Sequence, residues 1–320
     1  MILVVIVNYR TPKLTVDALH SLVNEVQRLP EVQVVVSDNA SGDDSVEVIS
    51  AAIDREGWHS WVKLMPLDKN GGFAYGNNAV IQEWLAKENP PQYVWLLNPD
   101  TVVRPQALKI LVDFMNAHPD VGIAGSRLED LDETPQRSAF RFHTVFSELD
   151  LGLRLGVATK LLSKWVVAPP VVDYSCQVGW VAGASMLVRR EVFDDIGLMD
   201  DSYFMYYEEM DFCLAASRAA WPCWYVPGSR VVHLVGQSSG VTNVKQPPKR
   251  RPQYWFDSRR RYFKKNYGKL YAELADYAWM FGYGLWSVRN VIQKKPQVDP
   301  PQFFFDFLKN SSAFKLGSNK

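Results

Sequence analysis

The sequence predicts an α/β protein with a doubly wound, mostly parallel sheet flanked by helices. Two observations carry this prediction. Short runs of β-branched residues alternate with longer segments in which apolar residues recur every three or four positions. Strands and helices that alternate in this way form right-handed β–α–β units, which place the strands parallel in one sheet. Ligands of such sheets bind beyond the carboxyl ends of the strands.

The first half of the chain supplies the strands and helices of this sheet. The expected strands are residues 2–9, 32–37, 61–67, 93–97 and 121–125. The expected helices are residues 13–28, 43–56, 74–87 and 105–117. The first helix places Leu19, Leu22, Val23 and Val26 on one stripe. The strand YVWLL (93–97) is apolar without alternation, which is typical of a strand that is covered on both faces.

The second half is less regular. Residues 129–174 show poor periodicity and are interpreted as a variable insertion with some helix. We expect strand, turn and strand over 178–189, a helix over 208–220, a short strand at 231–233 and helix from 259 to 293. After Lys245 the composition becomes basic and aromatic. These patterns predict a main domain over 1–240 and a helical C-terminal extension over 241–320.

The composition excludes several classes of function. Lys and Arg number 35 and so do Asp and Glu, so no overall field indicates a nucleic-acid partner. Cys176, Cys213 and Cys223 form no CxxC pair, which favours reduced thiols in the cytoplasm over a zinc site or disulfides. No basic segment precedes the apolar run 2–7, so no signal peptide is expected, and no window is long enough to span a membrane.

Polar residues follow three of the predicted strands. They are Asn8, Asp38 with Asn39, and the triplet Asn98-Pro99-Asp100. A carboxylate such as Asp100 could bind a divalent cation, whereas the plainer interpretation of the triplet is a turn that ends the strand. Three such strand ends together predict a ligand site at this edge of the sheet.

Seven segments then identify a family in which this pattern recurs. They are VIVNYR (5–10), SDNASGDDS (37–45), NGGFAYGNN (70–78), LLNPDTVV (96–103), GWVAGASMLVRR (179–190), FMYYEEMDFC (204–213) and VVHLVGQSS (231–239). In these segments, over about residues 2–270, the sequence resembles the inverting family 2 glycosyltransferases, which have the GT-A fold. Among these, it is most similar to bacterial rhamnosyltransferase-like enzymes. The resemblance implies a nucleotide-binding part over about 1–128 and an acceptor part over about 175–240.

The resemblance also implies which residues bind the donor, a nucleoside-diphosphate sugar such as dTDP-rhamnose or a UDP-sugar. They are Asn8, Tyr9, Asp38, Asn39, Asn70, Gly71, Gly72, Asn77, Asn98 and Asp100. Asp100 falls at the family's metal-binding DxD motif and would hold Mg²⁺ or Mn²⁺, with His233 as second ligand. A buried structural histidine is the alternative for His233.

The acidic cluster at 208–211 corresponds to the family's catalytic segment. By resemblance Glu209 is the base that deprotonates the acceptor, with Glu208 as the second candidate and Asp211 on the acceptor side. A solvated helix face is the alternative, because neighbours on a helix point about 100° apart. Trp180 and Gly183 lie in the loop that the family uses beside the acceptor, although a tryptophan is as readily a core residue. Ala215 and Ala220 depart from the family's usual Arg and Gly, which leaves the partner of Asp211 open.

The basic segment 245–269 has three interpretations: a solvated face, a lid over the donor diphosphate, or a surface for anionic lipid or a lipid-linked acceptor. The aromatic runs 277–288 and 303–307 favour peripheral membrane contact, with a dimer interface or the core as alternatives. The expected acceptor is a saccharide or a lipid-linked saccharide, and the expected product a precursor of cell-surface polysaccharide.

Two other functions are less consistent with the sequence. A nucleotidyltransferase would need a glycine-rich loop after Val7, where the chain has NYRTPK. A non-catalytic, membrane-associated subunit would not need Asp100, Glu209 and His233 together.

Overall fold

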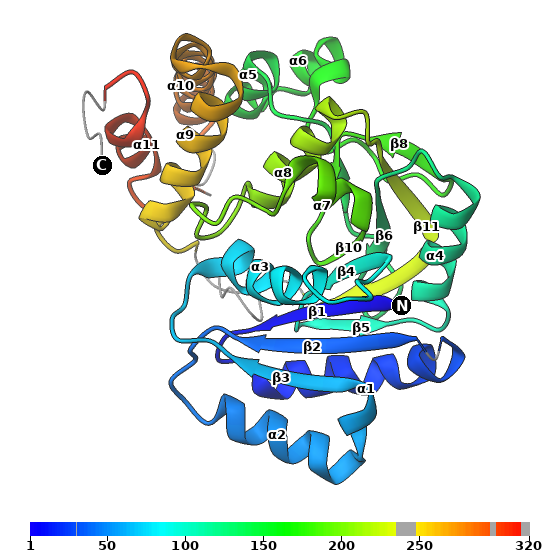
Figure 1. Cartoon of the computed structure of the whole chain (residues 1–320). Coiled ribbons are helices and arrows are strands. Elements are labelled where there is room, and N and C mark those ends of the chain that lie inside the picture. The colour runs from blue at the N-terminus through cyan, green and yellow to red at the C-terminus, as the bar shows by residue number, and fades with distance from the viewer. Residues whose placement is uncertain (30, 235–247, 295–298, 315–320) are drawn as a thin grey trace. The chain divides into compact units, whose positions relative to one another are not determined.

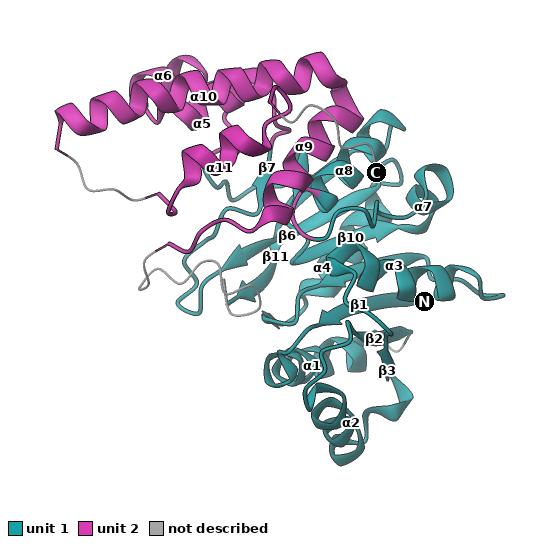
Figure 2. Ribbon diagram, turned by 90° about the vertical axis from the view of Figure 1, so that its left-hand side faces the viewer, with its two compact units in different colours: residues 1–140, 170–204, 208–240 teal, residues 141–169, 205–207, 241–320 magenta. Residues whose placement is uncertain are grey.

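A computed structural model describes residues 1–29, 31–234, 248–294 and 299–314 (Figure 1). The chain divides into two compact units, coloured separately in Figure 2. Unit 1 comprises residues 1–140, 170–204 and 208–240, and unit 2 comprises residues 141–169, 205–207 and 241–320. The two units are described in turn.

Unit 1 is built on a nine-stranded sheet with the order β3-β2-β1-β4-β10-β6-β11-β5, in which β8 also pairs with β11. Its strands are β1 (Ile2–Asn8), β2 (Val32–Asp38), β3 (Val62–Pro66), β4 (Tyr93–Leu97), β5 (Thr101–Val103), β6 (Ile123–Glu129), β8 (Cys176–Val178), β10 (Ser185–Arg189) and β11 (Cys223–His233). Strands β3, β2, β1 and β4 are parallel, and β10 runs antiparallel to both β4 and β6. A second sheet pairs β7 (Ala139–Phe140) with β9 (Trp180–Val181).

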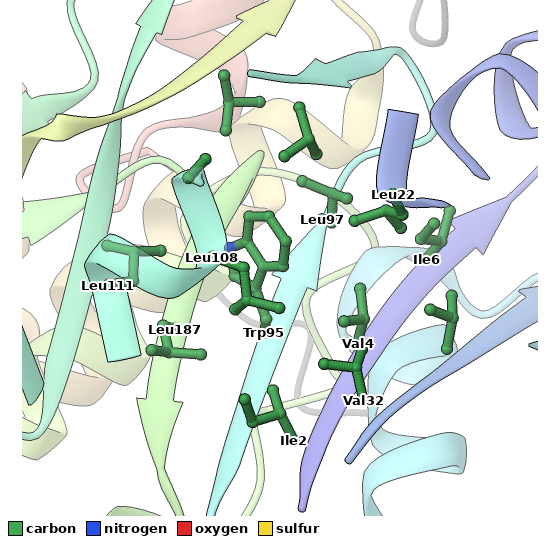
Figure 3. Packing of buried hydrophobic residues seen from close by; sticks show 14 of the residues in the cluster. Ile2, Val4, Ile6, Leu22, Val32, Trp95, Leu97, Leu108, Leu111 and Leu187 are labelled. Carbon is green, nitrogen blue, oxygen red and sulfur yellow. The ribbon is translucent and has the colours of Figure 1, made fainter. Parts of the chain in front are cut away.

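Helices cover both faces of this sheet, which confirms the predicted fold class. They are α1 (Pro12–Arg28), α2 (Ser45–Glu56), α3 (Gly72–Leu85), α4 (Ala107–Ala117), α7 (Arg190–Ile196) and α8 (Glu208–Arg218), with a 3₁₀ turn at Trp58–Ser60. Val4 and Ile6 pack with Trp95 and Leu97 of β4 and with Leu108 of α4 in one core cluster (Figure 3). The alternate residues of β1 are equally buried and point the other way, where α3 packs on β1 and β2.

Several elements differ from the sequence prediction: β7, β8 and α7 were not expected, and β6 continues to Glu129. Strand β11 begins at Cys223 rather than at 231. Its register with β6 shifts between Val226 and Arg230, and Pro227 and Gly228 lie in that interval. Strand β5 was not expected, since only three residues follow the triplet before Arg104. The helix expected over 259–293 is present and is divided into α9 (Gln253–Tyr267) and α10 (Lys269–Ile292), which are separated by Gly268 at φ +83°.

Unit 2 is helical. It contains α5 (Val145–Leu153), α6 (Gly156–Leu161), a 3₁₀ turn (Ser163–Trp165), α9, α10 and α11 (Phe303–Asn310). Helices α5 and α10 approach closely at two glycines: a Cβ on Gly152 would lie 2.5 Å from the carbonyl oxygen of Trp279, and one on Gly282 would lie 2.7 Å from that of Leu149. No helix within the described ranges combines the length and apolar composition that crossing a membrane requires.

A buried ionic network lies inside unit 2. The guanidinium of Arg259 contacts Glu148 at 2.7 Å and also contacts Asp276, and Nδ1 of His143 lies 2.7 Å from the other oxygen of Glu148. Burial alone would raise the pKa of Glu148, but Arg259 and His143 together lower this pKa to about 2. Arg259 belongs to the basic segment of the sequence, yet it is a buried partner of two carboxylates and not part of a solvated face.

Candidate active site

Asp38, at the carboxyl end of β2, is fixed by its neighbours. The Asn8 amide donates to Asp38 Oδ1 at 2.6 Å, the Ser41 hydroxyl donates to the same oxygen, and the Ser41 N–H donates to Oδ2 at 3.0 Å. The amide oxygen of Asn8 accepts from the Thr15 hydroxyl at 2.9 Å. Because the Asn8 amide is fully buried and bonded within the protein, its side chain orients Asp38. Ser41 and Thr15 complete this arrangement and were not singled out from the sequence.

Tyr9 and Asn39 follow the same two strands. Tyr9 is 38% exposed, and the Arg10 guanidinium lies 5.2 Å from the centre of its ring. The amide nitrogen of Asn39 donates to the Gly72 carbonyl at 2.9 Å, and its amide oxygen is buried without a hydrogen-bond partner among the described residues. The amide oxygen of Asn77, on α3, is likewise buried without a hydrogen-bond partner among the described residues. Buried acceptors are usually paired, so two such oxygens on neighbouring elements are unusual.

The Asn70-Gly71-Gly72 turn opens α3. The Asn70 side chain accepts from the Gly72 N–H at 3.0 Å. Gly72 has φ +89°, and a Cβ there would lie 1.8 Å from the carbonyl oxygen of Phe204, which accepts from the Phe73 N–H at 3.2 Å. A Cβ on Gly71 would overlap the Tyr75 ring. Glycine is therefore required at residue 72 because the backbone before α8 passes against it.

The structure brings Asp100 and His233 together. Strand β5 pairs with β11 so that Thr101 faces His233, and His233 Nε2 lies 3.5 Å from Asp100 Oδ1. The Leu234 N–H donates to the Asp100 carbonyl at 2.9 Å, which continues the pairing. Asp100 is 1% exposed. Asn98 is half-buried, and its N–H donates to the Ala184 carbonyl at 3.1 Å.

This pair fits a divalent cation that is shared with phosphate. A carboxylate oxygen and an imidazole nitrogen are donors that Mn²⁺ accepts, and Mg²⁺ suits the carboxylate. Among the described residues no third His, Cys, Asp or Glu joins them in a metal-binding group. Phosphate oxygens and water would complete the shell, as is usual for Mg²⁺ at phosphate sites.

The acidic residues at the start of α8 have different surroundings. Glu208 and Asp211 are buried, and the Tyr203 hydroxyl donates to Asp211 at 3.2 Å. Burial raises the pKa of the Glu209 carboxyl, while its own N–H and that of Gly183 act in the opposite direction. Oxygen Oε2 of Glu209 is buried without a hydrogen-bond partner among the described residues. Glu209 therefore has a carboxyl whose environment makes it a stronger base than an ordinary glutamate.

The loop before β10 adjoins Glu209. A Cβ on Gly183 would lie 3.1 Å from the Phe73 ring and 3.7 Å from the Glu209 Cβ. Gly183, Phe73 and Glu209 therefore lie close together. The sequence motifs do not identify Phe73 as part of this site. Trp180 stacks on Phe140 with 4.2 Å between ring centres and is half-buried, so one side of its ring packs within unit 1.

The backbone immediately before α8 is strained. Tyr206 and Tyr207 have φ of +70° and +73°, in the left-handed region that aromatic residues rarely occupy. Such strain costs about 1–3 kcal/mol per residue and is frequent at functional sites. No sequence signal predicts it. The GQSS part of the last motif, residues 236–239, lies outside the described residues, as do Lys245 and its neighbours up to 247.

Comparison with known proteins is consistent with this geometry. The family model "Glycosyl transferase family 2" matches residues 3–197. The chain is 29% identical over 223 residues to the N-acetylglucosaminyl-diphospho-decaprenol L-rhamnosyltransferase of Mycobacterium tuberculosis, which covers 65% of this chain and 68% of that protein. It is 28% identical over 165 residues to Rhamnosyltransferase WbbL of Escherichia coli, covering 51% of this chain and 60% of that protein.

Solved structures share the fold. GalNAc-T7 with UDP, GalNAc and Mn²⁺ superposes with a TM-score of 0.63 at 16% identity, over 98% of this chain and 55% of that chain. The 1–349 fragment of S. aureus TarS with UDP-GlcNAc superposes with a TM-score of 0.54 at 13% identity, over 97% of this chain and 81% of that chain. The match to the family model covers more than half of the sequence, so the chain belongs to glycosyl transferase family 2 and is a glycosyltransferase with the GT-A fold.

Proposed function

We propose that this protein is an inverting, metal-dependent glycosyltransferase that moves rhamnose from dTDP-rhamnose to a saccharide or lipid-linked saccharide in cell-surface polysaccharide synthesis. Another dTDP- or UDP-sugar as donor is the alternative. The observation that carries the proposal is the half-buried Glu209 beside Gly183, whose carboxyl oxygen Oε2 is itself buried, in the unit that also pairs Asp100 with His233. The donor and the acceptor class are supported by the relatives, which are rhamnosyltransferases, one of them named for a diphospho-decaprenol.

The donor nucleotide is assigned to the carboxyl ends of β1 and β2. Asp38 has both oxygens oriented by Asn8 and Ser41, so a pyrimidine N–H can be accepted without reorganising the site. Tyr9 offers a half-exposed ring beside this position. The amide oxygens of Asn39 and Asn77 are buried and lack a hydrogen-bond partner among the described residues, so a donor hydroxyl group would reach them only if neighbouring side chains moved.

Asp100 and His233 would hold Mg²⁺ or Mn²⁺. When bound, the ion neutralises charge on the departing nucleoside diphosphate. The protein contributes a fixed separation between the two ligands, because the backbone pairing of β5 with β11 sets it. We assign Asn98, which is half-buried before Asp100, to orienting the donor sugar or ribose.

Glu209 is the proposed base. Its carboxylate takes the proton of the acceptor hydroxyl while that oxygen bonds to the anomeric carbon, and the bond from this carbon to the diphosphate oxygen breaks on the opposite side. The sugar configuration is therefore inverted without a covalent intermediate. Asp211 is bonded to Tyr203 and positions the helix, and Glu208 is the second candidate for the base. Trp180 and Gly183 are assigned to the acceptor side.

Glu209→Gln tests the assignment, with Glu208→Gln as the matched variant. We expect Glu209→Gln to retain binding of dTDP and Mn²⁺ by calorimetry and to lose transfer by about a thousandfold or more, since general-base catalysis contributes roughly 10²–10⁴. Full activity in Glu209→Gln with loss in Glu208→Gln would move the base to Glu208. Wild-type activity should rise with pH as Glu209 ionises, with a midpoint above the ordinary glutamate pKa of 4.5.

The donor is tested separately. A set of nucleotide sugars is screened for metal-dependent thermal stabilisation, because a ligand of the folded state raises its apparent stability. We expect the largest rise with dTDP-rhamnose. A larger rise with a UDP-sugar would leave the transferase mechanism intact and replace the donor. A cytoplasmic location, part of the same proposal, is supported by three cysteines that are all free thiols.

A further inference from the structure

Helix α10 in unit 2 is apolar on two sides. One side is buried against the rest of the unit and includes Ala275, Trp279, Gly282, Tyr283 and Trp286. The other side exposes large apolar residues at intervals of three and four: Leu270, Leu274, Tyr277, Phe281, Leu285, Val288 and Ile292. Their exposed fractions range from 49% to 77%. We call these seven residues the α10 stripe.

The α10 stripe is too large to be incidental. Residues at these intervals form one line along a helix, and α10 has 24 residues, or about 36 Å of length. Apolar surface of this extent on a soluble protein marks an interaction site, whereas single exposed apolar residues need no explanation. The stripe is therefore expected to be covered when the protein works.

Charge indicates what covers it. Unit 2 contains 20 Lys and Arg against 7 Asp and Glu, a net charge of +13, and unit 1 contains 15 against 28, a net charge of −13. The neutral total of the chain conceals this separation. A strong charge asymmetry between parts of one chain is typical of proteins that bind polyanions or membranes.

Exposed lysines lie at both ends of the α10 stripe. Lys264, Lys265 and Lys269 precede Leu270 and are exposed, and Lys294 follows Ile292. Partial burial and the nearby charges of Arg260 and Lys269 lower the pKa of Lys264, so positive charges are crowded at this end. Crowded cations beside an apolar stripe are the two components that bind a protein to an anionic bilayer.

We propose that the α10 stripe and its flanking lysines dock on an anionic lipid surface, with α10 lying along the interface. A second copy of the chain fits less well, because two surfaces of the same strong positive charge repel. Within the described residues no helix can cross the bilayer, and the contact proposed here is that of a helix lying along the interface. This inference concerns unit 2 alone and does not depend on the proposed donor, acceptor or base.

Vesicle flotation of the full-length protein tests the inference. Vesicles of phosphatidylcholine alone are compared with vesicles that also contain phosphatidylglycerol, at low and at high salt. The stripe variant is Leu274→Ser with Phe281→Ser, and its control is Leu131→Ser, a 70%-exposed leucine of unit 1. The charge variant is Lys264→Gln with Lys269→Gln, and its control is Lys109→Gln, a lysine of unit 1 whose side chain is 45% exposed and lies beside Asp113.

We expect the wild type and both controls to float with anionic vesicles and to remain largely unbound with neutral ones. The stripe variant should bind at least about tenfold more weakly, and each lysine removed should weaken binding about fivefold, with less effect at high salt. The inference is overturned if both variants bind like the wild type, if the wild type binds no vesicles, or if the stripe variant instead converts a dimer into a monomer by light scattering.

A second measurement separates this inference from the proposed function. Sugar transfer to a water-soluble acceptor is assayed without vesicles for each variant. Retained transfer with lost flotation assigns the stripe to membrane docking, because the variants then fold and bind donor. Loss of transfer and flotation together, with an altered circular dichroism spectrum, would show that the stripe stabilises the fold and would contradict the docking role.

Discussion

Glu148→Gln should destabilise unit 2 strongly at neutral pH. The Glu148 carboxylate is 2% exposed and is held by Arg259 and His143. Its pKa falls from an ordinary value of 4.5 to about 2 in the folded protein. Each pKa unit is worth about 1.4 kcal/mol, so the ionised carboxylate contributes about 3 kcal/mol to stability. That is a large fraction of the roughly 5–15 kcal/mol by which proteins are stable.

The pH dependence has a defined direction. Because folding lowers this pKa, the stabilisation is fully present above pH 4.5 and is lost as the pH falls towards about 2. The neutral amide of Glu148→Gln has no such dependence. The difference in stability between the wild type and the variant should therefore shrink across this pH range.

Urea unfolding at several pH values measures this difference, followed by far-UV circular dichroism and tryptophan fluorescence. Urea is preferred to guanidinium chloride because it leaves the ionic interactions unscreened. The control is Glu273→Gln, which removes a partly exposed ion pair with Lys269 and should cost only a few tenths of a kcal/mol. A loss under about 1 kcal/mol at pH 7, or a loss that does not change with pH, would refute the reasoning.

Three further changes test unit 1. Gly72→Ala places a Cβ 1.8 Å from a backbone carbonyl oxygen at a residue with φ +89°, so thermal unfolding should show a loss of stability above about 2 kcal/mol. The control is Gly57→Ala, at φ +68° with open space around the added Cβ, which should show the cost of backbone strain alone. Asn8→Ala removes the amide bonded to Asp38 and should cost about 1–3 kcal/mol and weaken dTDP binding by calorimetry; unchanged dTDP affinity would contradict this role. Glu209→Gln should raise Tm at neutral pH, because burial disfavours the charge that it removes, and an equal or lower Tm would argue against a buried carboxylate.

The regular half of the fold could be predicted from the sequence. Strands β1 and β4 are apolar runs covered on both faces, β2 is mostly apolar and buried, and α1 and α4 have clear apolar stripes, so local pattern and tertiary burial agree. Strand β11 was underestimated because a Pro-Gly pair within it reads as a turn. The break between α9 and α10 depends on one glycine, which a helical pattern tolerates without revealing.

The site could be predicted where its residues lie in one sequence motif. It was less predictable where the pairing of strands far apart in the sequence brings the residues together. Asp100 and His233 were expected together only by resemblance, and the antiparallel pairing of β5 with β11 is what brings them within 3.5 Å. The buried role of Arg259 could not be foreseen, since its partner Glu148 lies in a segment without periodicity. The environment of Glu209, which depends on the Gly183 loop, likewise follows from folding.

The contact between α5 and α10 has a consequence for how this protein can evolve. At Gly152 and Gly282 the two helices meet backbone to backbone, so these positions admit no side chain. Packing within unit 2 therefore constrains the inner side of α10, whereas the outer side is exposed. Substitutions at Leu274 or Phe281 can therefore accumulate without disturbing the scaffold. The lipid surface that we propose for the outer side requires apolar residues there but no particular ones, so their identities can diverge between descendants while their apolar character is kept.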